Sequence, residues 1–201
     1  MRRKQITEST KRNREHRGRV AGMNPTEREF VVGELAASEA RLLDVVRGVT
    51  VAQASFRTGP ERWSIAEVLE HLVVWEGFML SAIRGALDTA ATPEKQAEVA
   101  AKDSLVRGLA TSRDKPLKSR EAARPTGRWS DVGTMLGEFR VRRAQTVEFV
   151  ESTQADLRSH FFAHVTFGDL DCYQWLGVVG QHTLRHVEQI EEIKRDAGFP
   201  K

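Results

Sequence analysis

Residues 171–194 read DCYQWLGVVGQHTLRHVEQIEEIK, and this stretch decides the fold because its apolar residues recur at helical spacing. Asp171 is a suitable N-cap with Gln174 at N3, and Gly198 followed by Pro200 predicts the end of the helix. On a helical wheel His186 lies about 40° from His182, and Gln189 about 20° to its other side. The pattern predicts a helix over 171–198 that presents two imidazoles and one amide on an apolar face.

Three further long helical patterns precede this one, and no convincing strand is found. Their starts carry N-cap residues, and two have the spacing of a capping box. The predicted helices run from Thr26, with Glu29 as its capping partner, to about Gly48; from Ser64, with Glu67 as its partner, through Ile83; and from Ser130 or Asp131 through Val150.

The connection between the second and third of these helices is long and polar. Thr92–Pro93 begins a weak, Ala-rich helical pattern that extends to about Leu109, and the residues after it have too few apolar side chains for a core element. Long connections allow neighbouring helices to pack in parallel. The sequence therefore predicts an all-α, four-helix bundle with a long crossover connection between helices 2 and 3.

The basic charge of the chain belongs to its first segment. Residues 1–22 carry eight Arg or Lys and two Glu, a net charge of +6, whereas the whole chain carries +3. This segment has too few apolar residues to fold, so we expect a disordered extension before a domain at 23–201. The alternatives are an arm that binds nucleic acid, which we consider the weaker interpretation, and a segment upstream of a start at Met23.

Composition excludes several classes of protein. A chain of 201 residues with 40% hydrophobic and 29% charged residues is typical of a folded domain, and no apolar run approaches the roughly 18 residues of a membrane span. Cys172 is the only cysteine, so neither a disulfide framework nor a thiolate-rich zinc site can form. The N-terminus lacks the apolar region of a secretory signal, and we expect a cytoplasmic protein that does not contact membranes.

The histidines predict a metal site. His71 lies in the second helix, and if that helix packs beside His182 and His186, three nitrogens converge and leave coordination positions open, as in catalytic metal centres. Gln189 can orient a ligand from the second shell, and Glu67 can accept the second N–H of His71, although we favour its capping role. The alternative is a set of hydrogen-bonded core histidines. No Glu follows His182, which excludes the zinc-protease motif.

Other candidate residues are assigned structural roles. Trp75 is interpreted as core or pocket wall, and Cys172 as a structural thiol because no basic residue is fixed beside it. His160 and His164 also stand four residues apart, but the neighbouring Gly168 indicates a loop, where that spacing does not bring side chains together. We therefore interpret both as surface or pocket-rim residues.

Two segments resemble the DinB/YfiT-like superfamily. The residues concerned are Trp63, Ser64 and His71 in RWSIAEVLEHLVVWE, and His182, His186, Gln189 and Ile190 in the last helix; the run PTGRWS is similar to the family's connector. The resemblance spans about residues 24–198. It implies a four-helix bundle, a divalent metal such as zinc or nickel on the three histidines, and often a homodimer. It also implies a small-molecule substrate, with low-molecular-weight thiols used by some members and hydrolysis by others.

The sequence as a whole predicts a metal-dependent enzyme that activates a thiol or a water, of the S-transferase or hydrolase type. Fold analogy cannot select the reaction. The alternatives are a bundle that binds metal or keeps the fold without turnover, and a nucleic-acid-binding protein that acts through residues 1–22.

Overall fold

Four long helices dominate the computed structural model, which describes residues 22–109 and 121–201. The N-terminal extension predicted for residues 1–22 lies, except for Gly22, outside the described residues. The long helices are α2 (Pro25–Val45), α4 (Ile65–Leu87), α7 (Val132–Ser152) and α8 (Cys172–Lys194). The chain is thus mostly helical, which confirms the prediction of a protein built mainly from helices.

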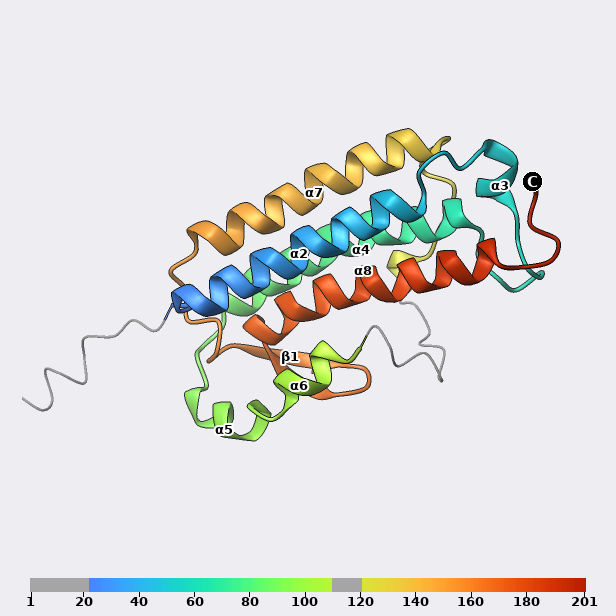
Figure 1. Ribbon diagram of the computed structural model, residues 1–201. Helices are drawn as coiled ribbons and strands as arrows, with labels where there is room; N and C mark the ends of the chain where they lie inside the picture. The colour runs from blue at the N-terminus through green and yellow to red at the C-terminus, as the bar shows by residue number, and fades with distance from the viewer. Residues whose placement is uncertain (1–21, 110–120) are drawn as a thin grey trace, which may run out of the picture.

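The long helices lie side by side in two parallel pairs. In Figure 1 the chain runs in one direction through α2 and α8 and in the other through α4 and α7. Helix α2 packs along α8 and α7, and α4 packs along α7 and α8. This arrangement places α4 next to α8, which is the requirement for His71 to meet the histidines of the last helix.

The helix starts follow local capping chemistry. Ser64 caps α4, Asp131 caps α7 and Asp171 caps α8, as the sequence predicts. The first helix differs, because Asn24 and Glu27 form its capping box, two residues before the predicted pair Thr26 and Glu29. Pro25 explains the shift, since proline is favoured at the first helical position and places the cap directly before it.

The connection between α4 and α7 is broken into short pieces. It contains η1 (Pro93–Lys95), α5 (Gln96–Val99), α6 (Lys102–Arg107) and η2 (Glu121–Ala123), where the sequence predicts one weak helix to Leu109; residues 110–120 lie outside the described part of the chain. Helix α6 packs on α8. A Cβ at Gly177 of α8 would lie 3.1 Å from Val106 Cγ1, so the glycine allows this close approach.

A β-hairpin precedes α8, and here the prediction of a purely helical chain is wrong. Strand β1 (Phe161–His164) pairs with β2 (Gly168–Asp171) in antiparallel register, with His164 opposite Gly168. Gly168 has a φ of +65°, which suits the turn of a short hairpin loop. The glycine that we interpreted as a loop signal is therefore the turn residue of a hairpin.

The bundle interior consists of two apolar clusters separated by a polar layer. One cluster surrounds Leu35, Met79 and Leu176, and the other surrounds Leu69, Phe139 and Ile190. Between them lies a buried polar layer, which we define as Ser38 of α2, Glu76 of α4, Arg143 and Thr146 of α7, and Thr183 of α8. All four long helices contribute to this layer, so it fixes their relative positions along the bundle.

The remaining short helix, α3 (Val51–Ser55), follows α2 and contacts α4. Among the described helices, none combines the length and the apolar character needed to cross a lipid bilayer.

Candidate metal centre

Three histidines meet between α4 and α8. His182 and His186 stand one turn apart on α8, and His71 faces them from α4. The Nε2 atom of His182 lies 3.3 Å from Nε2 of His71 and 3.2 Å from Nε2 of His186. One potential ligand nitrogen of each residue lies within 4.8 Å of the other two. The structure thus brings together the three residues that the sequence analysis selects.

The outer nitrogens of two of these rings have fixed partners. His71 Nδ1 lies 2.7 Å from the backbone oxygen of Ala123 in η2, and His186 Nδ1 lies 2.8 Å from Oε1 of Gln189. Both partners are oxygens that accept, so each Nδ1 carries the proton and each Nε2 keeps its lone pair. Gln189 therefore occupies the orienting position predicted for it.

Neither neutral tautomer of His182 gives every ring nitrogen of the three histidines a hydrogen-bond partner. The Nδ1 atom of His182 is buried and has no hydrogen-bond partner among the described residues. If His182 carries its proton on Nδ1, three Nε2 lone pairs face one another; if it carries the proton on Nε2, a buried lone pair at Nδ1 remains without a donor. A cation among the three Nε2 atoms would be bound by all three lone pairs, so the donor set fits a metal ion.

Burial keeps the imidazoles of His71 and His182 in the neutral form that binds metals. It lowers the pKa of His71, although the hydrogen bond to Ala123 acts in the opposite direction. Burial also lowers the pKa of His182 well below its ordinary value, and repulsion from His186 and His71, when those rings are protonated, adds to this effect. At neutral pH both rings are therefore unprotonated and available as ligands.

Two indoles form walls of the site. The ring of Trp75 stacks on that of His182 with centroids 3.8 Å apart, and the ring of Trp63 lies 5.0 Å from His71. Trp63 also stacks at 6.5 Å on His186. The two tryptophans restrict the ring orientations of all three histidines, and Trp75 is both a wall of the site and packed against one apolar cluster.

Glu67 does not contact His71 in the way that the sequence analysis considers. Its Oε2 accepts from the Ser64 N–H and its Oε1 from Arg57, which completes the capping box and an ion pair. The outer N–H of His71 instead donates to Ala123, which the sequence analysis does not identify. The neighbouring Glu70, also missed, binds the segment that follows Ala123.

The other polar candidates have structural roles. His164 Nδ1 accepts from the N–H groups of Thr166 and Phe167 and so closes the turn of the hairpin; this residue is buried rather than exposed. His160 Nδ1 lies 3.1 Å from the Ala86 oxygen. Burial, with the charge of Asp171 as a second cause, raises the pKa of the Cys172 thiol to about 12, so it is no nucleophile near neutral pH.

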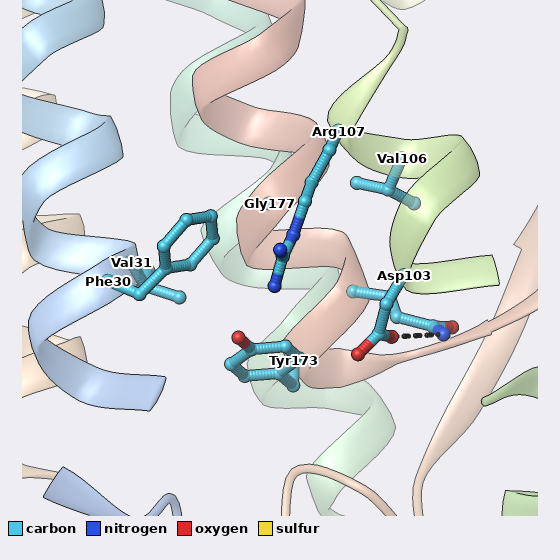
Figure 2. Close-up of a pocket in the computed structure, with 8 residues that line it drawn as sticks. Phe30, Val31, Asp103, Val106, Arg107, Tyr173 and Gly177 are labelled. Atoms are coloured by element: carbon cyan, nitrogen blue, oxygen red, sulfur yellow. Dashed lines mark hydrogen bonds between the residues drawn. The ribbon is translucent and has the colours of Figure 1, made fainter. Parts of the chain in front are cut away.

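A separate cavity lies between α2, α6 and α8 (Figure 2). It encloses about 270 Å³ including its open mouth, and its lining includes Phe30, Arg107 and Tyr173. Its one acidic residue, Asp103, is already bound by Gln174 and Arg158. Tyr173 is about 180° from His182 around the axis of α8, so this cavity is not part of the histidine site.

Comparison with known proteins places the chain in a family. The DinB superfamily matches residues 34–190, which is most of the chain. This protein belongs to the DinB superfamily. The uncharacterized protein YuaE of Bacillus subtilis (strain 168) is 25% identical over 166 residues, which cover 78% of this chain and 94% of YuaE.

A solved structure supports the fold. YfiT from Bacillus subtilis, described as a probable metal-dependent hydrolase with an unusual four-helix bundle topology, superposes with a TM-score of 0.56 at 13% identity. The match covers 90% of this chain and 93% of YfiT. At this identity the likeness concerns the fold, a bundle that in both proteins has four long helices.

Proposed function

We propose that this protein is a metal-dependent enzyme of the hydrolase or thiol S-transferase type, in which His71, His182 and His186 hold one divalent ion. The observation that carries the proposal is that the Nε2 atoms of His71 and His186 both lie within 3.3 Å of His182 Nε2, with no proton arrangement that satisfies all three rings. The likeness to YfiT, a probable metal-dependent hydrolase, supports the hydrolase type.

The donor set favours particular metals. Imidazole nitrogen suits zinc, nickel, copper and iron, whereas magnesium and calcium prefer oxygen ligands. Of these four we propose zinc or nickel, the metals that the resemblance to the DinB/YfiT-like superfamily implies. Three protein ligands leave at least one coordination position for a substrate, which distinguishes a catalytic site from a closed structural one.

The residues of the site bind and orient, and the ion supplies the reactivity. When bound, the ion would provide Lewis-acid activation of a thiol or a water near neutral pH. Ala123 and Gln189 hold the protons of His71 and His186 at Nδ1, away from the ligand positions. Trp63 and Trp75 cover the imidazoles and limit the access of bulk water. We propose a small-molecule substrate and include low-molecular-weight thiols among those to test.

Elemental analysis combined with substrate screens tests this proposal. Purified protein should contain about one zinc or nickel ion per chain, and His182→Ala and His186→Ala should each lose most of it. His160→Ala is the matched control, because His160 contacts Ala86 outside the triad. Full metal retention in both triad variants would refute the site.

The activity screen follows on the metal-loaded protein. Ester, amide and thiol-transfer substrates should be compared before and after chelation, with zinc and nickel added back separately. Turnover that is lost with the metal supports the enzyme. Stoichiometric metal without turnover on any of these classes would favour the alternative of a metal-binding bundle without activity.

A further inference from the structure

Glu70, which directly precedes His71 in α4, binds a segment of the long connection. Its Oε1 accepts from the Thr126 N–H at 2.7 Å and from Arg128 Nη1 at 2.7 Å, and its Oε2 accepts from the Gly127 N–H at 2.8 Å. The residue is only 3% exposed. Both carboxylate oxygens are therefore committed to the chain at 126–128.

The same segment supplies the partner of His71. Ala123, three residues before Thr126, places its backbone oxygen 2.7 Å from His71 Nδ1. Two adjacent residues of α4 thus hold the two ends of 123–128: the imidazole at Ala123 and the carboxylate at Thr126 and beyond. Because the segment is short, a shift at 126–128 would move the oxygen that fixes the proton on His71.

We infer that Glu70 is a positioning residue for the metal centre, holding the segment 123–128 so that Ala123 keeps His71 in the Nδ1–H form with its Nε2 lone pair toward the other histidines. This inference rests on the proposed function, since it assigns Glu70 a role in metal affinity. The route is indirect: Glu70 acts on the backbone, the backbone acts on His71, and His71 contacts the ion.

Burying the Glu70 carboxylate costs free energy of desolvation, and the hydrogen bonds that it accepts offset this cost. An ionised carboxylate without hydrogen bonds would be strongly unfavourable in this environment. Burial alone would raise the pKa of Glu70, but the hydrogen bonds from Thr126, Gly127 and Arg128 outweigh burial and lower it. Three donors, one of them the Arg128 guanidinium, converge on its two oxygens, so the carboxylate holds the segment by charge-assisted hydrogen bonds, which are stronger than those of a neutral acceptor.

The backbone of the segment is built to face this carboxylate. Gly127 has a φ of +77°, a conformation that a side chain disfavours, and a Cβ there would meet no atom within 4 Å. The glycine is therefore required by the backbone conformation rather than by space, and this conformation allows its N–H to donate to Glu70.

The test replaces Glu70 by Gln and measures both zinc affinity and the proton position on His71. The amide keeps the size of the side chain but turns one acceptor into an N–H donor, which must face a backbone N–H or Arg128. We expect Glu70→Gln to weaken zinc binding about tenfold, at the lower end of the range for outer-shell residues, in competition with a chromogenic chelator. Long-range ¹H–¹⁵N spectra of the metal-free protein should show His71 as Nδ1–H in the wild type and as a mixture in the variant.

Glu67→Gln is the matched control. It makes the same chemical change one turn earlier in α4, at a carboxylate bound to Ser64 and Arg57 instead of the connection. We expect it to lower the melting temperature while zinc affinity and the His71 tautomer stay as in the wild type. If Glu70→Gln fails to fold, Gly127→Ala perturbs the segment from the other side, because it strains the backbone without a clash.

The outcomes separate this inference from the proposed function. An unchanged His71 tautomer in a folded Glu70→Gln or Gly127→Ala variant overturns the role of Glu70, whatever the affinity. A wild type that binds no zinc or nickel refutes the proposed function, and the tautomer spectra then still decide whether Glu70 positions His71.

Discussion

Two buried polar groups stand close together in the bundle and differ in how completely they are paired. In the polar layer every nitrogen of the Arg143 guanidinium donates: Nε and Nη2 to Glu76, Nη1 to Ser38 and Nη2 also to Thr183. In the triad, three lone-pair nitrogens face one another and a fourth ring nitrogen has no partner among the described residues.

This difference in pairing distinguishes a polar layer that stabilises the fold from a group of side chains that can bind a ligand. A buried ion pair whose donors and acceptors are all matched needs nothing further, and it specifies how four helices align. Three nitrogen lone pairs that face one another are costly, and a cation between them would remove that cost. The two sets adjoin on the same helix, because Thr183 follows His182 in α8.

The largest effect is expected in the polar layer. Arg143→Met would leave Glu76 as a buried charge without its ion-pair partner, and both side chains are only 1% exposed. We expect a loss of about 3–5 kcal/mol in the free energy of unfolding. Denaturant unfolding of the metal-free protein measures this loss.

The double variant Arg143→Met with Glu76→Leu is its control. Removing both charges together leaves an apolar pair of similar volume, and the free energy of unfolding should recover most of the loss. A double variant as unstable as the single one would show that the hydrogen bonds that Arg143 donates to Ser38 and Thr183, rather than the unpaired charge, dominate the layer.

Substitutions in the triad should change the stability that bound metal provides, whereas substitutions in the polar layer should not. Bound metal stabilises the folded state by about 2.7 kcal/mol at a free concentration of 100 times the dissociation constant. We expect His71→Ala to lose that stabilisation, so its melting temperature falls mainly in zinc-loaded protein and only slightly after chelation. Melting curves of wild type and variant, each with and without chelator, give the four values needed. An equal fall in both conditions would make His71 a core residue.

The sequence predicts the long helices and the shared face of His182 and His186 well because both depend on local spacing, whereas the place of His71 beside them depends on the packing of α4 on α8. The apolar stripe and the four-residue step of His182 and His186 require only helix geometry, and the cap at Ser64 fixes where the His71 helix begins. The hairpin is not predicted because its strands are short. Its turn depends on a glycine, Gly168, and glycine is equally common in irregular loops.

The sequence does not show which charged residues pair over long distances along the chain. Glu76 and Arg143 lie 67 positions apart, and each by itself is typical of a solvated helix face. Glu70 and Ala123 are similar cases, since neither a lone Glu in a helix nor a backbone oxygen carries a signal. Only the packing of α4 against α7 and against the connection shows these pairings.

A smaller effect is expected at Gln189, which orients one ligand without contacting the ion. Its Oε1 accepts the Nδ1 proton of His186, and Gln189→Leu leaves that N–H without this acceptor. We expect zinc affinity to fall about tenfold, or about 1.4 kcal/mol, while the stability of chelated protein changes little. Competition titrations with a chromogenic chelator measure the affinity. An unchanged dissociation constant would show that the other contacts of the His186 ring, including its stacking on Trp63, are sufficient to orient it.

The smallest effect concerns acid and the metal-free triad. Burial lowers the pKa of His182 in the folded state, so between its folded value and the ordinary value near 6.5 the unfolded chain binds the proton more tightly. Stability must therefore rise with pH across this range and fall as pH decreases through 6.5.

A histidine that stays neutral in the folded state contributes a loss of about 0.7 kcal/mol between pH 7 and pH 6. In the presence of chelator, His182→Ala should reduce the pH dependence of the unfolding free energy by about that amount. Parallel curves for wild type and variant would mean that His182 titrates in the folded protein as it does in the unfolded chain, and the contrast with the fully paired Arg143 layer would fail at this ring.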